Sequence, residues 1–422
     1  MDYYEKYLKY KYKYLNLSNK NEQDNTNTMS VNQHDDNSTS ETFNNLILKL
    51  TKENDLQLLG GGNHSSNKWC KLPPNAKLYF GSGGSTAIVA VLDDVVYKYF
   101  PVFVKDTESN DDIKNEINYN KYEISVIKEL TKKIIDSKLS PHIIKYYNNY
   151  ECNKIPNDIF KDCPSFTEML MKKKGTSQKC HLNYYGHPKE LYKKMFVLAM
   201  EKADSSLSEE INKISKKKWV DIETFLNRLY FQVFYTLEII KKIYPKYCHN
   251  DLFIRNVMTK NVNYSENEYI RYHYNKMTFD LPANGLHVKI NDFGMNQLTN
   301  VLFKKYDIKD KIIDNPYRDY FSIIYDVYNG GNLGANSLTK LIKNKDKINQ
   351  IDKYFSNFID VKRIKQIIKN SHKRELDWNW NKTYDVDFVK LLKLKDFNTY
   401  LKYFLNIYPY DKEHKIVEEY GL

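Results

Sequence analysis

Residues 249–256 read His-Asn-Asp-Leu-Phe-Ile-Arg-Asn, and residues 290–294 read Ile-Asn-Asp-Phe-Gly. The first stretch places Asp251 five residues before Asn256, and the second places Asp292 directly before a Phe-Gly pair. Oxygen-bearing side chains in this order can orient a hydroxyl nucleophile and hold magnesium on a nucleotide. Either stretch alone is a weak signal, because a single Asp is most often a helix cap or a turn residue.

A glycine-rich turn and a lysine precede these two stretches. Residues 81–86 read Gly-Ser-Gly-Gly-Ser-Thr between predicted strands at 78–80 and 87–92, and Lys98 lies in a third predicted strand at 95–100. Small residues let backbone N–H groups approach phosphate oxygens, and a lysine among apolar strand neighbours needs an anionic partner. Taken singly, these features also fit a plain hairpin and an edge-strand lysine that faces water.

In this order, the motifs resemble those of a eukaryotic-type protein kinase in a divergent form, over about residues 77–330. The resemblance implies an α+β fold with two lobes: a small β-rich N-lobe with one main helix, and a larger helical C-lobe. It also implies an enzyme that uses ATP and Mg²⁺ to transfer the γ-phosphate to Ser or Thr hydroxyls of proteins.

The resemblance assigns a nucleotide site residue by residue. The family pattern GxGxxG followed by Val is matched at Gly81 and Gly83, whereas Thr86 and Ile88 replace the third Gly and the Val. A predicted strand at 195–200 would lead into the hinge, whose backbone binds the adenine edge. The ATP-binding residues expected in this way are Gly81, Ser82, Gly83, Gly84, Ser85, Thr86, Ile88, Lys98, Met200, Glu201 and Ala203.

The catalytic and metal-binding roles fall on the two stretches quoted first. Asp251 is expected to accept or orient the proton of the substrate hydroxyl. Asn256 and Asp292 are expected to bind magnesium, which prefers hard oxygen ligands. The resemblance gives His249 a structural role, and it gives Asp319 the role of bracing the catalytic loop.

The carboxylate partner of Lys98 is open between two residues. Glu123 opens a segment, Glu-Ile-Ser-Val-Ile-Lys-Glu-Leu, that is similar to the family's helix signature. Glu116 lies closer to the usual sequence distance from the lysine. We prefer Glu123 as the ion-pair partner, with Glu116 as the alternative.

Two positions of the catalytic loop depart from the family pattern, and a third offers a candidate replacement. Asn250 replaces the Arg that normally binds a phosphate on the activation segment, so control by such a phosphate is not expected. Phe253 replaces the Lys that Ser/Thr kinases usually carry two residues after the catalytic Asp. Arg255 matches the position that tyrosine kinases use, and is a candidate substitute for that Lys.

The spacing after the catalytic loop is also unusual. Asn256 and Asp292 are 36 residues apart, and the end of this insertion, 281–290, is similar to the haspin branch of atypical Ser/Thr kinases. Asp292 and Asp319 are only 27 residues apart, which leaves a short activation segment. We therefore hypothesise a constitutively active enzyme.

The pattern of apolar residues gives the remaining organisation. Periodic apolar positions predict helices at about 115–137, 225–243 and 319–328, and residues 143–147 read as a strand. Residues 18–42 are polar and are expected to be disordered. The predicted domains are an N-terminal extension at 1–76, an N-lobe at 77–203 with an insertion at 151–190, a C-lobe at 204–330 with an insertion at 260–285, and a helical C-terminal extension at 331–422.

Composition narrows the choice of partner and compartment. The 65 Lys and Arg against 53 Asp and Glu fit Lys-rich solvated faces, and without a known RNA- or DNA-binding motif we expect protein substrates rather than nucleic acid. Five cysteines without CxxC spacing favour a reduced intracellular compartment, the host cytoplasm, without structural zinc. No apolar run is long enough to span a membrane. The 37 tyrosines and abundant Asn, Lys and Ile are similar to proteins encoded by AT-rich giant DNA viruses.

Two other functions remain compatible with these motifs. Small-molecule phosphotransferases of kinase-like fold also use HxDxxxxN loops without the Arg, although their second metal motif differs from Asp-Phe-Gly. A nucleotide-binding pseudokinase or scaffold is the third possibility, although Lys98, Asp251, Asn256 and Asp292 are all retained.

Overall fold

The computed structural model divides into two units. Unit 1 is Met1–Ser109 with Asn149–Leu198, and unit 2 is Asn110–Asn148 with Ala199–Leu422. The residues that the structure describes are 70, 76–80, 88–103, 110–152, 192–296, 298, 317–330, 337–370, 391–393 and 397–421. Predictions for residues 18–42, for the glycine-rich turn at 81–86 and for nearly all of the insertion at 151–190 lie outside them.

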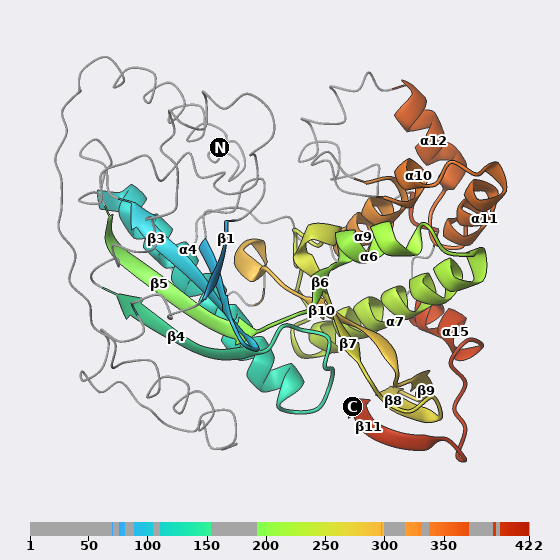
Figure 1. Cartoon of the computed structure of the whole chain (residues 1–422), viewed down its shortest axis with the longest axis horizontal. Helices are drawn as coiled ribbons and strands as arrows, with labels where there is room; N and C mark the ends of the chain where they lie inside the picture. Colours follow the sequence, from blue (N-terminus) through green and yellow to red (C-terminus); the bar gives the residue numbers. More distant parts are fainter. Residues whose placement is uncertain are drawn as a thin grey trace. The chain divides into compact units, whose positions relative to one another are not determined.

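A five-stranded sheet, in the order β1-β2-β3-β5-β4, belongs mainly to unit 1 (Figure 1). The first three strands pair antiparallel, and the turn between β2 and β3 contains Asp93, whose φ is 52°. Along β3, Tyr97 and Tyr99 are buried while Val96 and Lys98 are partly exposed, the two-residue period of a strand. The strands are β1 (Lys77–Phe80), β2 (Ile88–Leu92), β3 (Val95–Phe103), β4 (Tyr146–Cys152) and β5 (Tyr192–Glu201).

The four strands predicted at 78–80, 87–92, 95–100 and 195–200 are confirmed. The strand predicted at 143–147 is wrong in its limits, because β4 begins only at Tyr146 and Ile143 forms an isolated bridge to Ile290. The apolar pair Ile143-Ile144 is buried against β10 (Gly285–Ile290) of unit 2 instead of extending the strand.

A disulfide joins Cys70 to Cys152 at the end of β4, with a Cα–Cα distance of 5.6 Å. The prediction that the cysteines are reduced is therefore wrong for this pair, which no short spacing in the sequence indicated. These two cysteines lie 82 residues apart in the chain. Cys248 is buried and is not part of this disulfide.

Helix α4 (Asn110–Leu130) continues into a π-helical turn, Thr131–Ile135, and both belong to unit 2. The predicted helix at 115–137 is confirmed and begins five residues earlier. Its predicted apolar face is buried, with Ile127, Leu130 and Ile134 at most 1% exposed. This is the helix that carries Glu123.

The core of unit 2 surrounds α7 (Trp219–Ile243), which confirms the helix predicted at 225–243 and starts six residues earlier. The predicted inner face is fully buried: Leu226, Leu229, Val233, Leu237 and Ile240. The helix at 319–328 is likewise confirmed as α9 (Arg318–Asn329). The other helices described are α6 (Leu207–Ile214), α10 (Leu338–Leu341), α11 (Lys345–Phe355), α12 (Val361–Asn370) and α15 (Phe397–Leu405). No described helix is long and apolar enough to cross a membrane.

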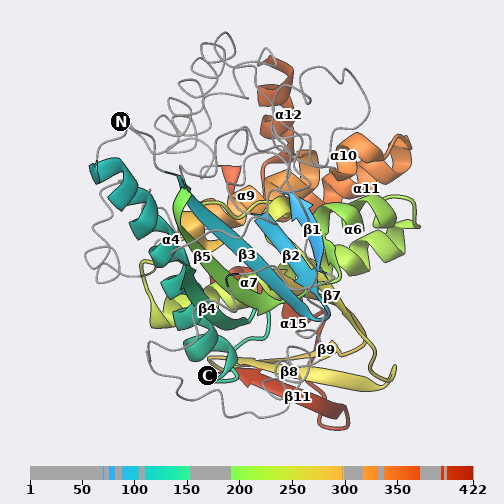
Figure 2. The same ribbon diagram turned by 60° about the vertical axis from the view of Figure 1, so that its left-hand side comes forward.

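Two three-stranded sheets complete unit 2. One has the order β10-β7-β6, of which β7 and β10 come after the catalytic loop in the chain, and the other has the order β11-β8-β9 (Figure 2). Strand β11 comes from the C-terminal segment that the sequence analysis expected to be helical, and it pairs parallel with β8. Strands β8 and β9 lie within the predicted insertion at 260–285. The bounds are β6 (Ser205–Ser206), β7 (Val257–Val262), β8 (Glu268–Tyr274), β9 (Met277–Pro282), β10 (Gly285–Ile290) and β11 (Lys415–Gly421).

Candidate active site

The loop that carries Asp251 is held by two buried aspartates of α9. The carboxylate of Asp319 accepts hydrogen bonds from the backbone N–H groups of His249 at 2.6 Å and Asn250 at 2.9 Å. The carboxylate of Asp326 accepts one from the backbone N–H of Ile254 at 2.8 Å. A buried N–H without an acceptor is costly, so these contacts fix the loop on both sides of Asp251.

Two side chains hold the carboxylate of Asp251. The Nδ2 of Asn256 donates to its Oδ2 and to its backbone carbonyl, both at 2.7 Å, and Arg255 donates to its Oδ1. The side chain of Asp251 remains 22% exposed, which leaves access for a substrate. Burial raises the pKa of Asp251, the positive charge of Arg255 opposes that rise, and the nearby Asp292 adds to it.

Arg255 reaches Asp251 across an aromatic ring. Its guanidinium carbon lies 4.7 Å from the ring centre of Phe253, within the range of a cation–π contact. The short 3₁₀ turn Ile254–Asn256 brings the residue four positions after Asp251 back toward it. Phe253, which departs from the family pattern, and Arg255 therefore act together in placing one positive charge beside Asp251.

Asp292 is brought to the catalytic loop by the pairing of β7 with β10. Val257, directly after Asn256, pairs with Ile290, and the backbone N–H of Asn291 donates to the carbonyl of Asn256 at 2.9 Å. Asp292 itself has the left-handed backbone angles φ 62° and ψ 73°. Few residues other than Gly adopt this conformation, Asp is among those that tolerate it, and such positions are frequent at functional sites.

His249 also links the catalytic loop to the segment that contains Asp292. Its Nε2 donates to the carbonyl of Asn291 at 3.0 Å, which places the ring proton on Nε2 because a carbonyl only accepts. Its ring also lies 5.2 Å from that of Phe293. The structural role predicted for His249 is consistent with these contacts between the catalytic loop and the Asp-Phe-Gly segment.

Glu123 lies beside Gly294 and is 8% exposed. A Cβ added to Gly294 would come within 3.1 Å of Glu123 Oε2, so a larger residue there would press on the carboxylate. The neighbouring Tyr122 donates to the carbonyl of Asn296 at 2.9 Å. The side chain of Glu116, the alternative, lies outside the described ones.

Lys98 lies on β3 of unit 1, opposite Val89 of β2, with its Nζ 4.9 Å from the ring centre of Phe100. Its place in the strand next to the glycine-rich turn is the one predicted. Glu123 belongs to unit 2, and the pairing of Lys98 with Glu123 stays a prediction.

The predicted hinge begins within the end of β5, since Met200 and Glu201 are its last two residues, and a buried ion pair fixes it. The backbone N–H of Glu201 donates to the carbonyl of Lys145 at 2.8 Å and is therefore not open to adenine. The carboxylate of Glu201 binds Lys289 at 2.9 Å and Lys260 at 3.0 Å. Burial would raise the pKa of Glu201, but the two lysines outweigh burial and lower it.

The ATP-binding roles of the other two hinge residues stay predictions. Met200 is buried, at 4% exposed. The backbone of Ala203 makes no hydrogen bond to another described residue, so its N–H and carbonyl are open to a ligand.

Sequence reasoning missed Asp326, Lys289 and Lys260. Asp326 follows Asp319 by seven residues, two turns of one helix, so the same face of α9 had to present both. The helical spacing between Asp319 and Asp326 could therefore have predicted that Asp326 also supports the catalytic loop. Lys289 and Lys260 reach Glu201 through strand pairing between distant segments, which no local pattern reveals.

The oxygen atoms beside Asp251 fit a magnesium ion that is shared with a nucleotide. The Nδ2 of Asn256 donates hydrogen bonds to Asp251. The Oδ1 of Asn256 has no hydrogen-bond partner among the residues that the structure describes. Asp292 supplies a carboxylate. No group of three or more His, Cys, Asp or Glu able to hold a metal occurs among the described residues. Magnesium often keeps waters and phosphate oxygens as ligands, so two protein ligands suffice.

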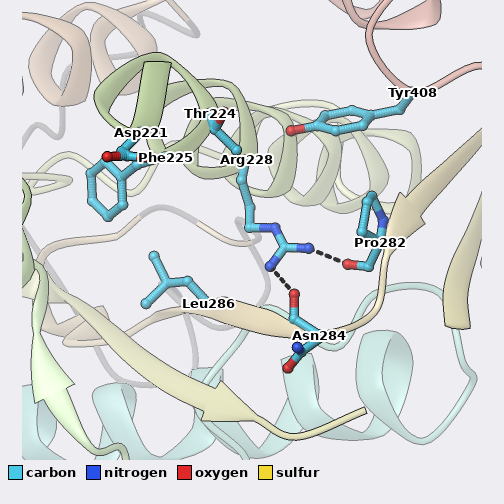
Figure 3. A pocket seen from close by; sticks show the side chains of 8 residues that line it. All are labelled: Asp221, Thr224, Phe225, Arg228, Pro282, Asn284, Leu286 and Tyr408. Carbon is cyan, nitrogen blue, oxygen red and sulfur yellow. Dashed lines mark hydrogen bonds between the residues drawn. The ribbon is translucent and has the colours of Figure 1, made fainter. Parts of the chain in front are cut away.

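A separate cavity of about 390 Å³ lies between the first half of α7 and the turn from β9 to β10 (Figure 3). In it, Arg228 donates to the backbone carbonyls of Pro282 and Asn284. Burial lowers the pKa of Arg228, which nevertheless stays a cation. None of the predicted site residues lines this cavity, and Arg228 ties α7 to the strands after the catalytic loop.

The loop Asp held by Asn and Arg, next to an Asp-Phe-Gly segment, is the arrangement that the sequence predicted for a phosphotransferase. No protein-family model matches the chain. A protein of Acanthamoeba polyphaga mimivirus named "Putative serine/threonine-protein kinase" is 31% identical over 342 residues, which cover 74% of this chain and 83% of that relative. The chain therefore belongs to the serine/threonine-protein kinase family and is an enzyme of that class. The relative comes from a giant DNA virus, in agreement with the composition.

Proposed function

We propose that the enzyme transfers the γ-phosphate of ATP to Ser or Thr hydroxyls of proteins in a magnesium-dependent reaction. The observation that carries this proposal is the arrangement at Asp251, whose carboxylate is held by Asn256 and Arg255 and faces the charge of Asp292. A carboxylate so fixed, still partly exposed, can orient an incoming hydroxyl.

In this reaction the substrate oxygen forms a bond to the γ-phosphorus, and the bond from that phosphorus to the β–γ bridging oxygen breaks. Asp251 orients the hydroxyl and receives its proton, while ADP leaves. Magnesium held by Asn256 and Asp292 would supply positive charge to the phosphate oxygens. Arg255 would add a further positive charge where the transferred group passes Asp251.

We also propose the finer assignments that the sequence suggested. Unit 1, with its sheet and Lys98, corresponds to the N-lobe, and unit 2 to the C-lobe together with helix α4. The glycine-rich residues 81–86 would cover the phosphates, and Ala203 would bind the adenine edge. The likeness of residues 281–290 to the haspin branch likewise stays part of this proposal, and the insertion that contains them forms the β8–β9 hairpin.

The test uses purified full-length chain, magnesium and γ-labelled ATP, with casein, histone, a Glu-Tyr copolymer and small-molecule alcohols as separate acceptors. We expect label on casein or histone, and phosphoamino-acid analysis should find phosphoserine or phosphothreonine. Label only on the copolymer would make the enzyme a tyrosine kinase. Label only on small alcohols would favour a small-molecule phosphotransferase, and ATP binding without any transfer would favour a pseudokinase.

A further inference from the structure

The segment that joins α4 to β4, residues 138–144, is bound tightly within unit 2. The backbone N–H of Ile290 donates to the carbonyl of His142 at 2.9 Å. The Nδ1 of His142 donates to the carbonyl of Val288 at 3.1 Å, so its Nε2 accepts from the hydroxyl of Tyr272 at 2.9 Å. Both ring nitrogens of this fully buried histidine are therefore used, and the partner on each side comes from the strands that follow the catalytic loop.

Tyr272 is in turn held by the C-terminal strand. It lies on β8, the central strand between β9 and β11, and its buried ring stacks on Tyr420 of β11 with ring centres 5.8 Å apart. Strand β11 also touches the joining segment directly, because the N–H of Gly421 donates to the carbonyl of Lys138 at 3.1 Å. Gly421 has φ +140°, and a Cβ there would collide with the carbonyl of His273.

Two further hydrogen bonds connect helix α4 to other parts of unit 2. Near its middle, Tyr122 binds the carbonyl of Asn296, and near its end Glu129 accepts from the hydroxyl of Tyr244 at 2.7 Å. The helix and the joining segment together belong to unit 2 rather than to the unit of Lys98. A helix fastened in the middle, at its end and through the segment after it has little freedom to turn.

We infer that strand β11 acts through Tyr272 and His142 to hold α4 in one position, with Glu123 beside Gly294. The position of this helix is then set by the chain's own C-terminal strand, and no phosphate on the activation segment is needed. His142 and Tyr272 are positioning residues, since they act on the site through α4. The catalytic consequence of this inference rests on the proposed kinase function, whereas its structural part does not.

The experiment compares the full-length chain with Tyr272→Phe, which removes only the hydroxyl that His142 uses. The matched control is Tyr274→Phe, on the same strand, whose hydroxyl donates to Glu238 at 3.0 Å and not to the joining segment. Hydrogen–deuterium exchange is followed in peptides of α4 and of α7. We expect exchange in α4 to become about three- to tenfold faster in Tyr272→Phe, with α7 unchanged, and expect no change in α4 for the control.

A second variant, Gly421→Val, acts on β11 itself and should give the same pattern. Equal acceleration in α4 and α7 would show general destabilisation and overturn the inference, as would unchanged exchange in α4 in both variants. The activity readout is separate: kcat should fall several-fold in Tyr272→Phe while the KM for ATP stays within about twofold. A chain without any transfer activity would refute the proposed function, and the exchange result would still decide the inference.

Discussion

Three charged side chains act on one another at the catalytic loop, namely Asp251, Arg255 and Asp292. Arg255 stabilises the carboxylate directly, and Asp292 repels it. The residue that usually carries the positive charge is replaced by Phe253, whose ring instead supports the guanidinium. The loop thus keeps a cation next to Asp251 although the position of that cation in the sequence has moved.

Removing this cation should slow the chemical step. In Arg255→Leu we expect kcat to fall about 10- to 100-fold, because the carboxylate of Asp251 loses the partner that fixes its direction. ATP affinity, measured by calorimetry, should change less than about threefold, since Arg255 contacts Asp251 and not the hinge. Arg255→Lys should recover part of the rate, because an ammonium keeps the charge but not the planar geometry. An unchanged kcat in Arg255→Leu would contradict this role.

At the scale of elements, α9 is the support of the catalytic loop. Asp319 and Asp326 lie two turns apart on one buried face, and together they accept three backbone N–H groups of the loop. The rigid helix α9 therefore fixes the position of the catalytic loop.

Loss of one of these acceptors should affect stability and rate together. Asp326→Ala leaves the buried N–H of Ile254 without a partner, which costs about 1–3 kcal/mol of unfolding free energy. Urea denaturation should show that loss, and kcat should fall with it. Asp346→Ala, an exposed first-turn aspartate of α11, is the control and should change the unfolding free energy by less than about 0.5 kcal/mol. Full stability in Asp326→Ala would rule out the bracing role.

The elements that sequence could predict are those whose signal is local. The apolar residues that recur along α7 are buried in the structure, and so are alternate residues along β3. Both patterns were predictable because each arises from burial of one face of the element. Strand β11 was missed, since Lys415–Gly421 mixes charged and apolar residues and its partner strand is far away in the chain. The pair Cys70–Cys152 and the lysines around Glu201 were missed for the same reason, namely that their partners meet only after folding.

The catalytic motifs were predictable because their spacing reflects chemistry. Asp251 and Asn256 must share one short loop, and that loop is where the structure places them. Glu123 was chosen over Glu116 on similarity alone, so the carboxylate partner of Lys98 stays a prediction.

At the scale of the whole molecule, unit 2 buries two histidines where α7, β8, β10 and the joining segment meet. Burial lowers the pKa of His287 to about 4, with Arg228 and Lys289 adding repulsion and Glu418 opposing it. Burial also lowers the pKa of His142 well below its ordinary value. Both residues are therefore neutral in the folded protein at neutral pH.

Acid should accordingly destabilise the fold. Below pH 6.5 the two histidines bind protons in the unfolded chain but stay neutral in the folded protein. The free energy of unfolding therefore falls as the pH drops from 6.5 toward 4. Each histidine contributes a slope of up to about 1.4 kcal/mol per pH unit in that window. Urea denaturation at pH 7.5, 6.0 and 5.0 measures it, and His287→Asn should weaken the dependence. The same pH dependence in wild type and His287→Asn would contradict this origin.

We propose that Asp251 directs phosphoryl transfer, and the decisive measurement is transfer from labelled ATP by the wild type beside Asp251→Asn. The asparagine keeps the size of the side chain and removes its ability to take a proton. We predict that transfer to a protein acceptor falls by about 10²- to 10⁴-fold while ATP binding in the presence of magnesium persists. Equal transfer by the two proteins would contradict the account.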